Sequence, residues 1–160
     1  LTIYGPPGMK DIVTGLIAAM RPSARSGFGI PGETAIDPAA NIRVVELDDG
    51  AVAKLDGFTV RVASNSHYSF VPGSDEEKTF RSLSYRFDLP ERSIIYTGDT
   101  GPSDKVTALA KGAQAGVGRV VVTHLAGGGA LGAQADQRYR SEIQQRFKGP
   151  VLIAKDMDRF

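Results

Sequence analysis

The amino-acid sequence predicts an α/β protein with mixed, largely antiparallel sheets and helices outside them. Two Asp-Gly pairs, at 49–50 and 56–57, separate short apolar runs, and such pairs are typical of turns between antiparallel strands. Apolar and polar residues alternate over 58–63 and again over 82–89, as in strands with one buried face. Apolar residues at four-residue spacing over 9–20 predict an amphipathic helix.

The chain begins with a short apolar run, 1–4, which predicts a strand that ends at a Gly-Pro-Pro-Gly turn. The helix predicted over 9–20 follows this turn. The next stretch, 21–38, is rich in Pro, Gly, Ser and Arg, so it is predicted to be a loop. A flexible surface connection is favoured there over a loop that gates access to a substrate.

The middle of the chain is rich in residues that favour strands. An acidic, polar segment over 72–78 interrupts these strands and is predicted to be a loop. Two-residue turns join antiparallel strands, so this region is expected to form sheet and not helix. The strands expected in this region are, in order, 42–47, 51–55, 58–63, 82–89 and 94–97.

The last third of the chain alternates between helical and strand patterns. Ser103 is a suitable N-cap, and Asp104 favours the first turn of the helix that follows it. The three glycines at 127–129 lack the lysine and spacing of a phosphate-binding loop, so a flexible linker is favoured there. The other expected elements are a doubly covered strand at 120–122, a helix over 133–147 and a closing strand at 151–154.

The composition is that of an ordinary globular protein. With 160 residues, the chain is long enough for one domain with a sizeable core, and we expect a single domain over 1–160. The formal net charge of +1 argues against a strongly basic nucleic-acid-binding surface. The sequence has no cysteine, which excludes disulfide frameworks, thiolate chemistry and cysteine-based zinc modules. No apolar run is long enough to span a bilayer.

Three residues that can bind metal follow apolar strands. The two histidines of the chain, His67 and His124, each come where such a strand ends, and Asp99 follows a third strand on a glycine turn. Taken singly, each histidine is more simply a surface residue, and Asp99 a turn residue or helix cap. Their common position favours a divalent metal site at one edge of the sheets, where the three side chains would converge.

The residues around these positions resemble those of a known family. Segments 93–103, with Tyr-Thr-Gly-Asp-Thr, and 120–125, with Thr-His-Leu, are similar to motifs of the metallo-beta-lactamase superfamily, as is the opening Leu-Thr-Ile-Tyr-Gly-Pro-Pro-Gly. The ribonuclease Z-like and arylsulfatase-like hydrolases are the branch that they resemble most. The similarity extends from residue 1 to the closing Gly-Pro-Val-Leu-Ile-Ala-Lys-Asp at 149–156. The resemblance implies an αββα sandwich.

The chain also departs from this family. The signature His-x-His-x-Asp-His, which in the family precedes the Leu-Thr-Ile-Tyr-Gly-Pro-Pro-Gly element, does not occur. A strand, an acidic residue and a helix that the family has before its Thr-His-Leu strand are also lacking, which suggests an internal gap near 113–117. We therefore expect an incomplete sandwich, the C-terminal portion of a hydrolase, whose exposed apolar faces would be covered by the missing segments or by a partner chain.

In the intact family, two metal ions, usually zinc, share a hydroxide that attacks an ester or phosphodiester bond. The resemblance assigns His67 to one ion, His124 to the other and Asp99 to the bridge between them, with Asp99 and His124 as catalytic residues. Manganese or iron are alternatives to zinc, because imidazole and carboxylate bind all three. Without the signature motif each ion has too few ligands, so this chain alone is expected to be inactive.

The predicted function is a metal-dependent hydrolase acting on phosphodiester or ester bonds of a small molecule. A ribonuclease Z-like RNA-processing nuclease and a metal-free binding or scaffold domain of the same fold are the alternatives. RNA is the less favoured substrate because of the near-neutral charge. A homo-oligomer, no membrane association and a cytoplasmic location are expected, with export left open. Tyr68 and Phe70 follow His67, and core packing is favoured over a pocket-lining role for both.

Overall fold

The computed structural model describes residues 1–35, 37–111, 113, 117–123, 132–155 and 158–159. The contacts divide the chain into two compact units, Leu1–Gly112 and Ala113–Phe160. The expected single domain over 1–160, with a gap near 113–117, stays a prediction.

The first unit begins with a small parallel sheet and its helix. Strand β1 (Thr2–Gly5) pairs in parallel with β2 (Arg43–Glu46), so that Ile3 lies opposite Val44. The connection between them contains α1 (Met9–Arg25), which packs against β2, and the short 3-10 helix η1 (Gly27–Gly29). The crossover helix is what a parallel pair of strands requires.

Helix α1 is longer than predicted. It continues through Pro22 to Arg25, into the stretch predicted as a loop. Ala24 is only 1% exposed, so the last turn is held by packing, which outweighs the helix-breaking effect of the proline. The glycine-rich stretch that follows is irregular apart from η1, as predicted.

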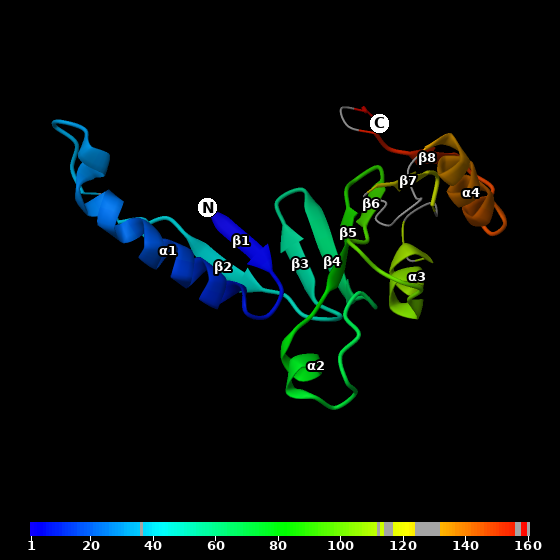
Figure 1. Ribbon diagram of the computed structural model, residues 1–160, viewed down its shortest axis with the longest axis horizontal. Coiled ribbons are helices and arrows are strands. Elements are labelled where there is room, and N and C mark those ends of the chain that lie inside the picture. Colours follow the sequence, from blue (N-terminus) through cyan, green and yellow to red (C-terminus); the bar gives the residue numbers. More distant parts are fainter. Residues whose placement is uncertain (36, 112, 114–116, 124–131, 156–157, 160) are drawn as a thin grey trace. The chain divides into compact units, whose positions relative to one another are not determined.

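The main sheet has four antiparallel strands in sequence order (Figure 1). They are β3 (Val52–Leu55), β4 (Phe58–Ser64), β5 (Leu83–Asp88) and β6 (Ser93–Tyr96). The predicted strands and their antiparallel pairing are confirmed here, and the protein is a mixed α/β protein. Because β4 and β6 both run opposite to β5, their carboxyl ends lie at the same edge of the sheet.

One of the two Asp-Gly turns was interpreted wrongly. The turn at 56–57 joins β3 to β4 as a hairpin, but the turn at 49–50 does not join β2 to β3. The chain leaves the small sheet at Leu47, whose N–H donates to the carbonyl of Gly5, and crosses to β4, where Gly50 donates to Val62. Strand β2 already pairs with β1, so the apolar runs on both sides of this turn belong to different sheets.

The core of the first unit lies on one face of the main sheet. Phe58 and Phe87 pack around it with their rings 6.4 Å apart. The alternation predicted for β4 and β5 supplies these side chains, since every second residue points to the same face. The buried members of the cluster are Leu47, Val60, Val62 and Leu83.

The opposite face of β5 is covered as well, which the alternation did not predict. Helix α3 (Asp104–Lys111) packs against β4 and β5. Under it, Ser84 is 0% exposed and Arg86 is 7% exposed, although both were predicted to face solvent. The Arg86 guanidinium is accommodated because its Nη1 donates to the carbonyl of Leu109, 2.8 Å away.

The acidic segment predicted as a loop contains a short helix. Helix α2 (Asp75–Thr79) lies in the connection from β4 to β5, and the Ser74 side chain caps it by accepting from the N–H of Glu77. Three consecutive acidic residues occupy its first turn, where the helix dipole favours negative charge. The prediction missed α2 because five residues are too few to show helical periodicity.

The second unit is small. Strands β7 (Val120–Val122) and β8 (Val151–Ile153) pair in parallel, and α4 (Ala133–Gln144) packs against β8. Helix α4 ends three residues before its predicted end at 147. Val121 in β7 is 38% exposed, whereas this strand was expected to be covered on both faces. The glycines at 127–129 lie outside the described residues. In the described part of the chain, no helix has the length and apolarity needed to cross a bilayer.

Candidate functional site

Two of the three predicted metal ligands lie at one edge of the main sheet. His67 comes three residues after the end of β4, and Asp99 comes three residues after the end of β6. Both are exposed. The antiparallel order β4-β5-β6 brings the segments that carry them together at the edge where β5 begins. The third predicted ligand, His124, lies outside the described residues, so the convergence of all three stays a prediction.

Asn65 joins these two segments. Its Nδ2 donates to the carbonyl of Thr97 at 3.0 Å and to Oγ of Ser84 at 3.2 Å, and Ser84 Oγ donates to the same Thr97 carbonyl at 2.6 Å. Its Oδ1 accepts from the backbone N–H of His67 at 3.1 Å. One amide side chain therefore orients the backbone of His67 against the end of β6, over a hydroxyl that is fully buried.

A second set of contacts lies one residue further along. Ser66 Oγ donates to the carbonyl of Pro102 at 3.0 Å, and the Ser66 N–H approaches Oγ1 of Thr100 at 3.4 Å. Thr100 and Pro102 follow Asp99 directly in the chain. The segments 65–67 and 97–102 are thus held together on both sides of Asp99.

The glycine before Asp99 is required by this arrangement. Gly98 has φ +62°, a conformation that side chains other than glycine rarely adopt. A Cβ there would also lie 3.6 Å from the carbonyl oxygen of Leu83 and 3.9 Å from Nδ2 of Asn65. These are ordinary contact distances, so the backbone conformation, and not a lack of space, favours glycine before Asp99.

Sequence reasoning missed Asn65 and Ser84 as supporting residues. The signal was present in the polar triplet Ser64-Asn65-Ser66, which ends an apolar strand just before a candidate ligand. Ser84 gave no comparable signal, because a serine at an alternating position is typical of an exposed strand face.

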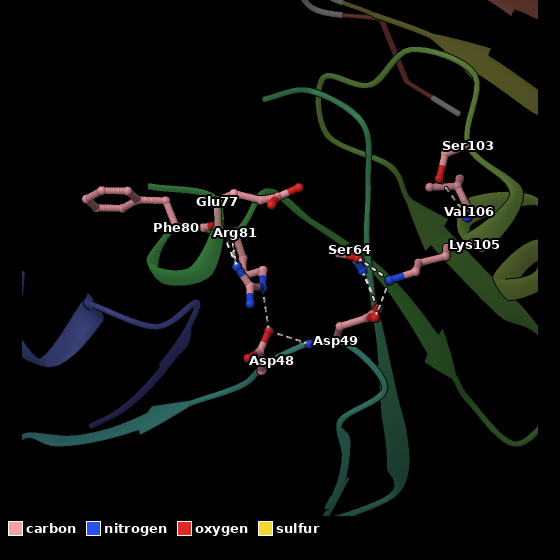
Figure 2. Close-up of polar contacts among 9 residues, drawn as sticks. All are labelled: Asp48, Asp49, Ser64, Glu77, Phe80, Arg81, Ser103, Lys105 and Val106. Carbon is pink, nitrogen blue, oxygen red and sulfur yellow. Dashed lines mark hydrogen bonds and ion pairs between the residues drawn. The ribbon is translucent and has the colours of Figure 1, made fainter. Parts of the chain in front are cut away.

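The Asp48–Asp49 turn anchors two segments near this edge (Figure 2). Oδ1 of Asp48 pairs with Nε of Arg81, at 3.2 Å, beyond the end of α2. Oδ2 of Asp49 pairs with Nζ of Lys105 in α3, and Lys105 also donates to Oγ of Ser64 at 2.9 Å. Adjacent carboxylates thus hold the segment that follows His67 and the helix that follows Asp99.

The contacts of Asp49 lower its pKa below the ordinary value of 3.8, chiefly through the hydrogen bond from Lys105 and then that from the Ser64 N–H. A carboxyl group whose pKa is lower in the folded state stabilises the fold above its unfolded pKa. This contribution is lost as the pH falls through the folded pKa.

Replacing Asp49 by asparagine is therefore expected to reduce stability near neutral pH, with the difference from the unchanged protein shrinking below pH 3.8. Urea unfolding at a series of pH values measures this. Asp48→Asn is the matched control, because it alters the neighbouring carboxylate and leaves the Lys105 pair intact. A pH-independent difference for Asp49→Asn would contradict the prediction.

The described residues do not complete a metal site by themselves. In that part of the chain, no group of three or more His, Cys, Asp or Glu side chains is placed to hold an ion. His67 and Asp99 supply an imidazole and a carboxylate on joined segments, which suits zinc as part of a larger set of ligands. Catalytic zinc uses three protein ligands, so His67 and Asp99 alone would not form such a site.

Comparison with known proteins gives relatives that are named ribonuclease Z. Ribonuclease Z of Mycobacterium avium (strain 104) is 25% identical over 198 residues, which cover 99% of this chain and 66% of the relative. Ribonuclease Z of Mycobacterium sp. (strain KMS) is 31% identical over 115 residues, which cover 72% of the chain and 36% of the relative. The chain is similar to ribonucleases Z.

The chain spans less than two thirds of the length of these relatives. The aligned stretch of 198 residues in the Mycobacterium avium protein is longer than the 160 residues of this chain, so the alignment includes positions with no counterpart here. No family model matches the chain. Among the predicted functions, the similarity supports the alternative, an RNA-processing nuclease, better than the broader hydrolase of small molecules.

Proposed function

We propose that this chain is part of a metal-dependent nuclease of the ribonuclease Z type, with the metallo-beta-lactamase fold. The similarity to ribonucleases Z over 99% of the chain carries the proposal. This similarity makes RNA the favoured substrate, whereas the net charge had favoured a small-molecule ester or phosphodiester over RNA. A net charge of +1 describes the whole chain and does not exclude contacts with a few phosphates.

His67, Asp99 and His124 are the proposed ligands, with Asp99 between two ions. What supports this is the donor chemistry together with the hydrogen bonds of Asn65 and Ser66, which hold the His67 segment against the Asp99 turn. Bound zinc would supply a hydroxide at neutral pH and stabilise charge on the phosphate. The chain itself contributes two backbone segments, held together by these hydrogen bonds, that carry the imidazole and the carboxylate.

A metal-free binding or scaffold domain is the second candidate. It is favoured by one observation, that the sequence contains two histidines and no His-x-His-x-Asp-His motif. The homo-oligomer expected from the sequence also remains a proposal.

Three substrates distinguish these candidates: a single-stranded RNA, a bis-nitrophenyl phosphodiester and a nitrophenyl carboxylic ester. The nuclease is expected to cleave the RNA and the phosphodiester, to lose this activity on chelation and to recover it with added zinc. Faster hydrolysis of the carboxylic ester would favour the small-molecule esterase. If the protein binds no zinc, and cleaves none of the three substrates with or without added zinc, this would support the metal-free binding or scaffold domain.

A further inference from the structure

A row of aromatic rings begins at His67. The His67 and Tyr68 ring centroids are 5.2 Å apart, those of Tyr68 and Phe70 5.0 Å, and those of Phe70 and Phe80 6.2 Å. These separations lie in the range of favourable aromatic contacts. Tyr68, Phe70 and Phe80, which we call the aromatic row, therefore form one continuous set leading away from a proposed metal ligand.

The aromatic row is open to solvent. Tyr68 is 49% exposed and Phe80 52% exposed, whereas Phe70 between them is half-buried. The core-packing role favoured for Tyr68 in the sequence is therefore wrong. Contiguous exposed apolar side chains are typical of surfaces that bind a ligand or another macromolecule.

Both ends of the aromatic row are held in place. At one end, the backbone N–H of His67 donates to Asn65. At the other end, Phe80 directly follows α2, and its neighbour Arg81 pairs with Asp48. Figure 2 shows the Phe80 ring pointing away from this ion pair. Because the backbone is held at both ends, a ligand would have less of this segment to order on binding.

We propose that the aromatic row is a stacking platform for unpaired nucleobases of an RNA strand whose scissile phosphate lies at His67. The inference rests on the proposed nuclease function and adds the part of the substrate that is recognised. Flat bases stack on Tyr and Phe rings, and every base presents such a face. Because the Tyr68 ring contacts the His67 ring, a substrate bound at His67 would extend over the aromatic row.

The charges near Phe80 specify how the strand is held. Asp75, Glu76 and Glu77 are exposed in α2, and this helix ends next to Phe80. Carboxylates repel phosphates, so the base and not the backbone faces this surface. The contribution of the aromatic row to binding is therefore expected to depend little on salt, unlike contacts between cations and phosphates.

A fluorescent reporter at Phe80 tests the platform directly. The chain contains no tryptophan, so Phe80→Trp introduces a single indole and retains an aromatic face. Titration with single-stranded oligoadenylate RNA in EDTA is expected to quench the indole emission. A fully base-paired RNA duplex is expected to leave the emission unchanged, because its bases are already stacked. Equal quenching by both would overturn the inference.

Removing rings is the complementary test. Tyr68→Leu and Phe80→Leu keep apolar volume but remove the stacking faces, and each is expected to weaken oligoadenylate binding about fivefold or more. The factor should be similar at low and high salt. Tyr4→Leu is the matched control, since it removes another partly exposed ring, 39% exposed, from β1. Unchanged affinity in both leucine variants of the row would overturn the inference.

The two proposals fail separately. Binding in EDTA requires no metal and no cleavage, so binding at the aromatic row without RNA cleavage in any form of the protein would refute the nuclease and leave the platform standing. Cleavage that is unaffected by Tyr68→Leu and Phe80→Leu, with unchanged affinity, would refute the platform and leave the nuclease. A change of oligomeric state in the leucine variants would assign the row to a protein interface and refute the platform.

Discussion

Replacing Asp99 by alanine is expected to abolish RNA cleavage in the form of the protein that is active. Loss of a partner that only supports a metal ligand typically lowers activity or metal affinity 10–100-fold. A carboxylate shared by two ions should exceed this, so we expect kcat/KM to fall by more than about a hundredfold. Zinc affinity, measured by titration calorimetry on the form of the protein that cleaves RNA, should fall by about tenfold or more.

The fold should survive this change, because Asp99 is exposed and follows the last strand of the main sheet. Circular dichroism and the urea midpoint check this. Asp104→Ala is the matched control, since it removes an exposed carboxylate from the first turn of α3 only a few residues away. Cleavage by the Asp99 variant at the rate of the Asp104 variant would rule out the bridging role.

Among the substitutions proposed for this protein, Arg86→Ala is expected to give the largest loss of stability. The guanidinium lies under α3 and pairs with Asp88, with Nε 2.9 Å from Oδ1 and Nη2 3.1 Å from Oδ2. Breaking a buried ion pair typically costs 3–5 kcal/mol. Asp88 keeps hydrogen bonds from Arg61 and Ser93, so we expect a loss of about 3 kcal/mol in the free energy of unfolding.

Arg61 provides a matched control for this prediction. It pairs with the same carboxylate, with its Nε 3.0 Å from Oδ2 of Asp88, but its side chain is 46% exposed. Arg61→Ala is expected to cost less than about 1 kcal/mol, as exposed pairs do. Arg86→Met, which keeps apolar volume, should recover part of the loss. Equal losses for the two alanine variants in urea unfolding would show that burial does not decide the effect.

Most strands were predictable because their patterns are local. Alternation identified β4 and β5, and the turn at 56–57 identified their neighbour β3. The partner of a strand is not a local property, so the similar Asp-Gly signal at 49–50 was misread although β2 itself was identified. Burial of Ser84 and Arg86 was missed for the same reason, since it depends on where α3 packs.

For the candidate site, the positions of two proposed ligands were predictable, but the hydrogen bonds that support them were not. Positions after strand ends identified His67 and Asp99, because the ends of β4 and β6 lie at one edge. The sequence did not predict what holds them there, since Asn65 acts through hydrogen bonds to residues 19 and 32 positions away. The exposure of Tyr68 was misjudged because ring type alone does not distinguish a buried side chain from an exposed one.

The hydrogen bond from the Asn65 N–H to the Ser82 carbonyl, 2.9 Å long, closes the connection between β4 and β5 at its base. A segment tied at its base can lengthen at small entropic cost, since doubling a loop costs only about 0.6 kcal/mol. The residues beyond this tie can therefore be exchanged for others while the strand register stays unchanged. Evolution or an engineer can alter which molecules reach His67 by changing the residues between His67 and Ser82, and leave the sheet as it is.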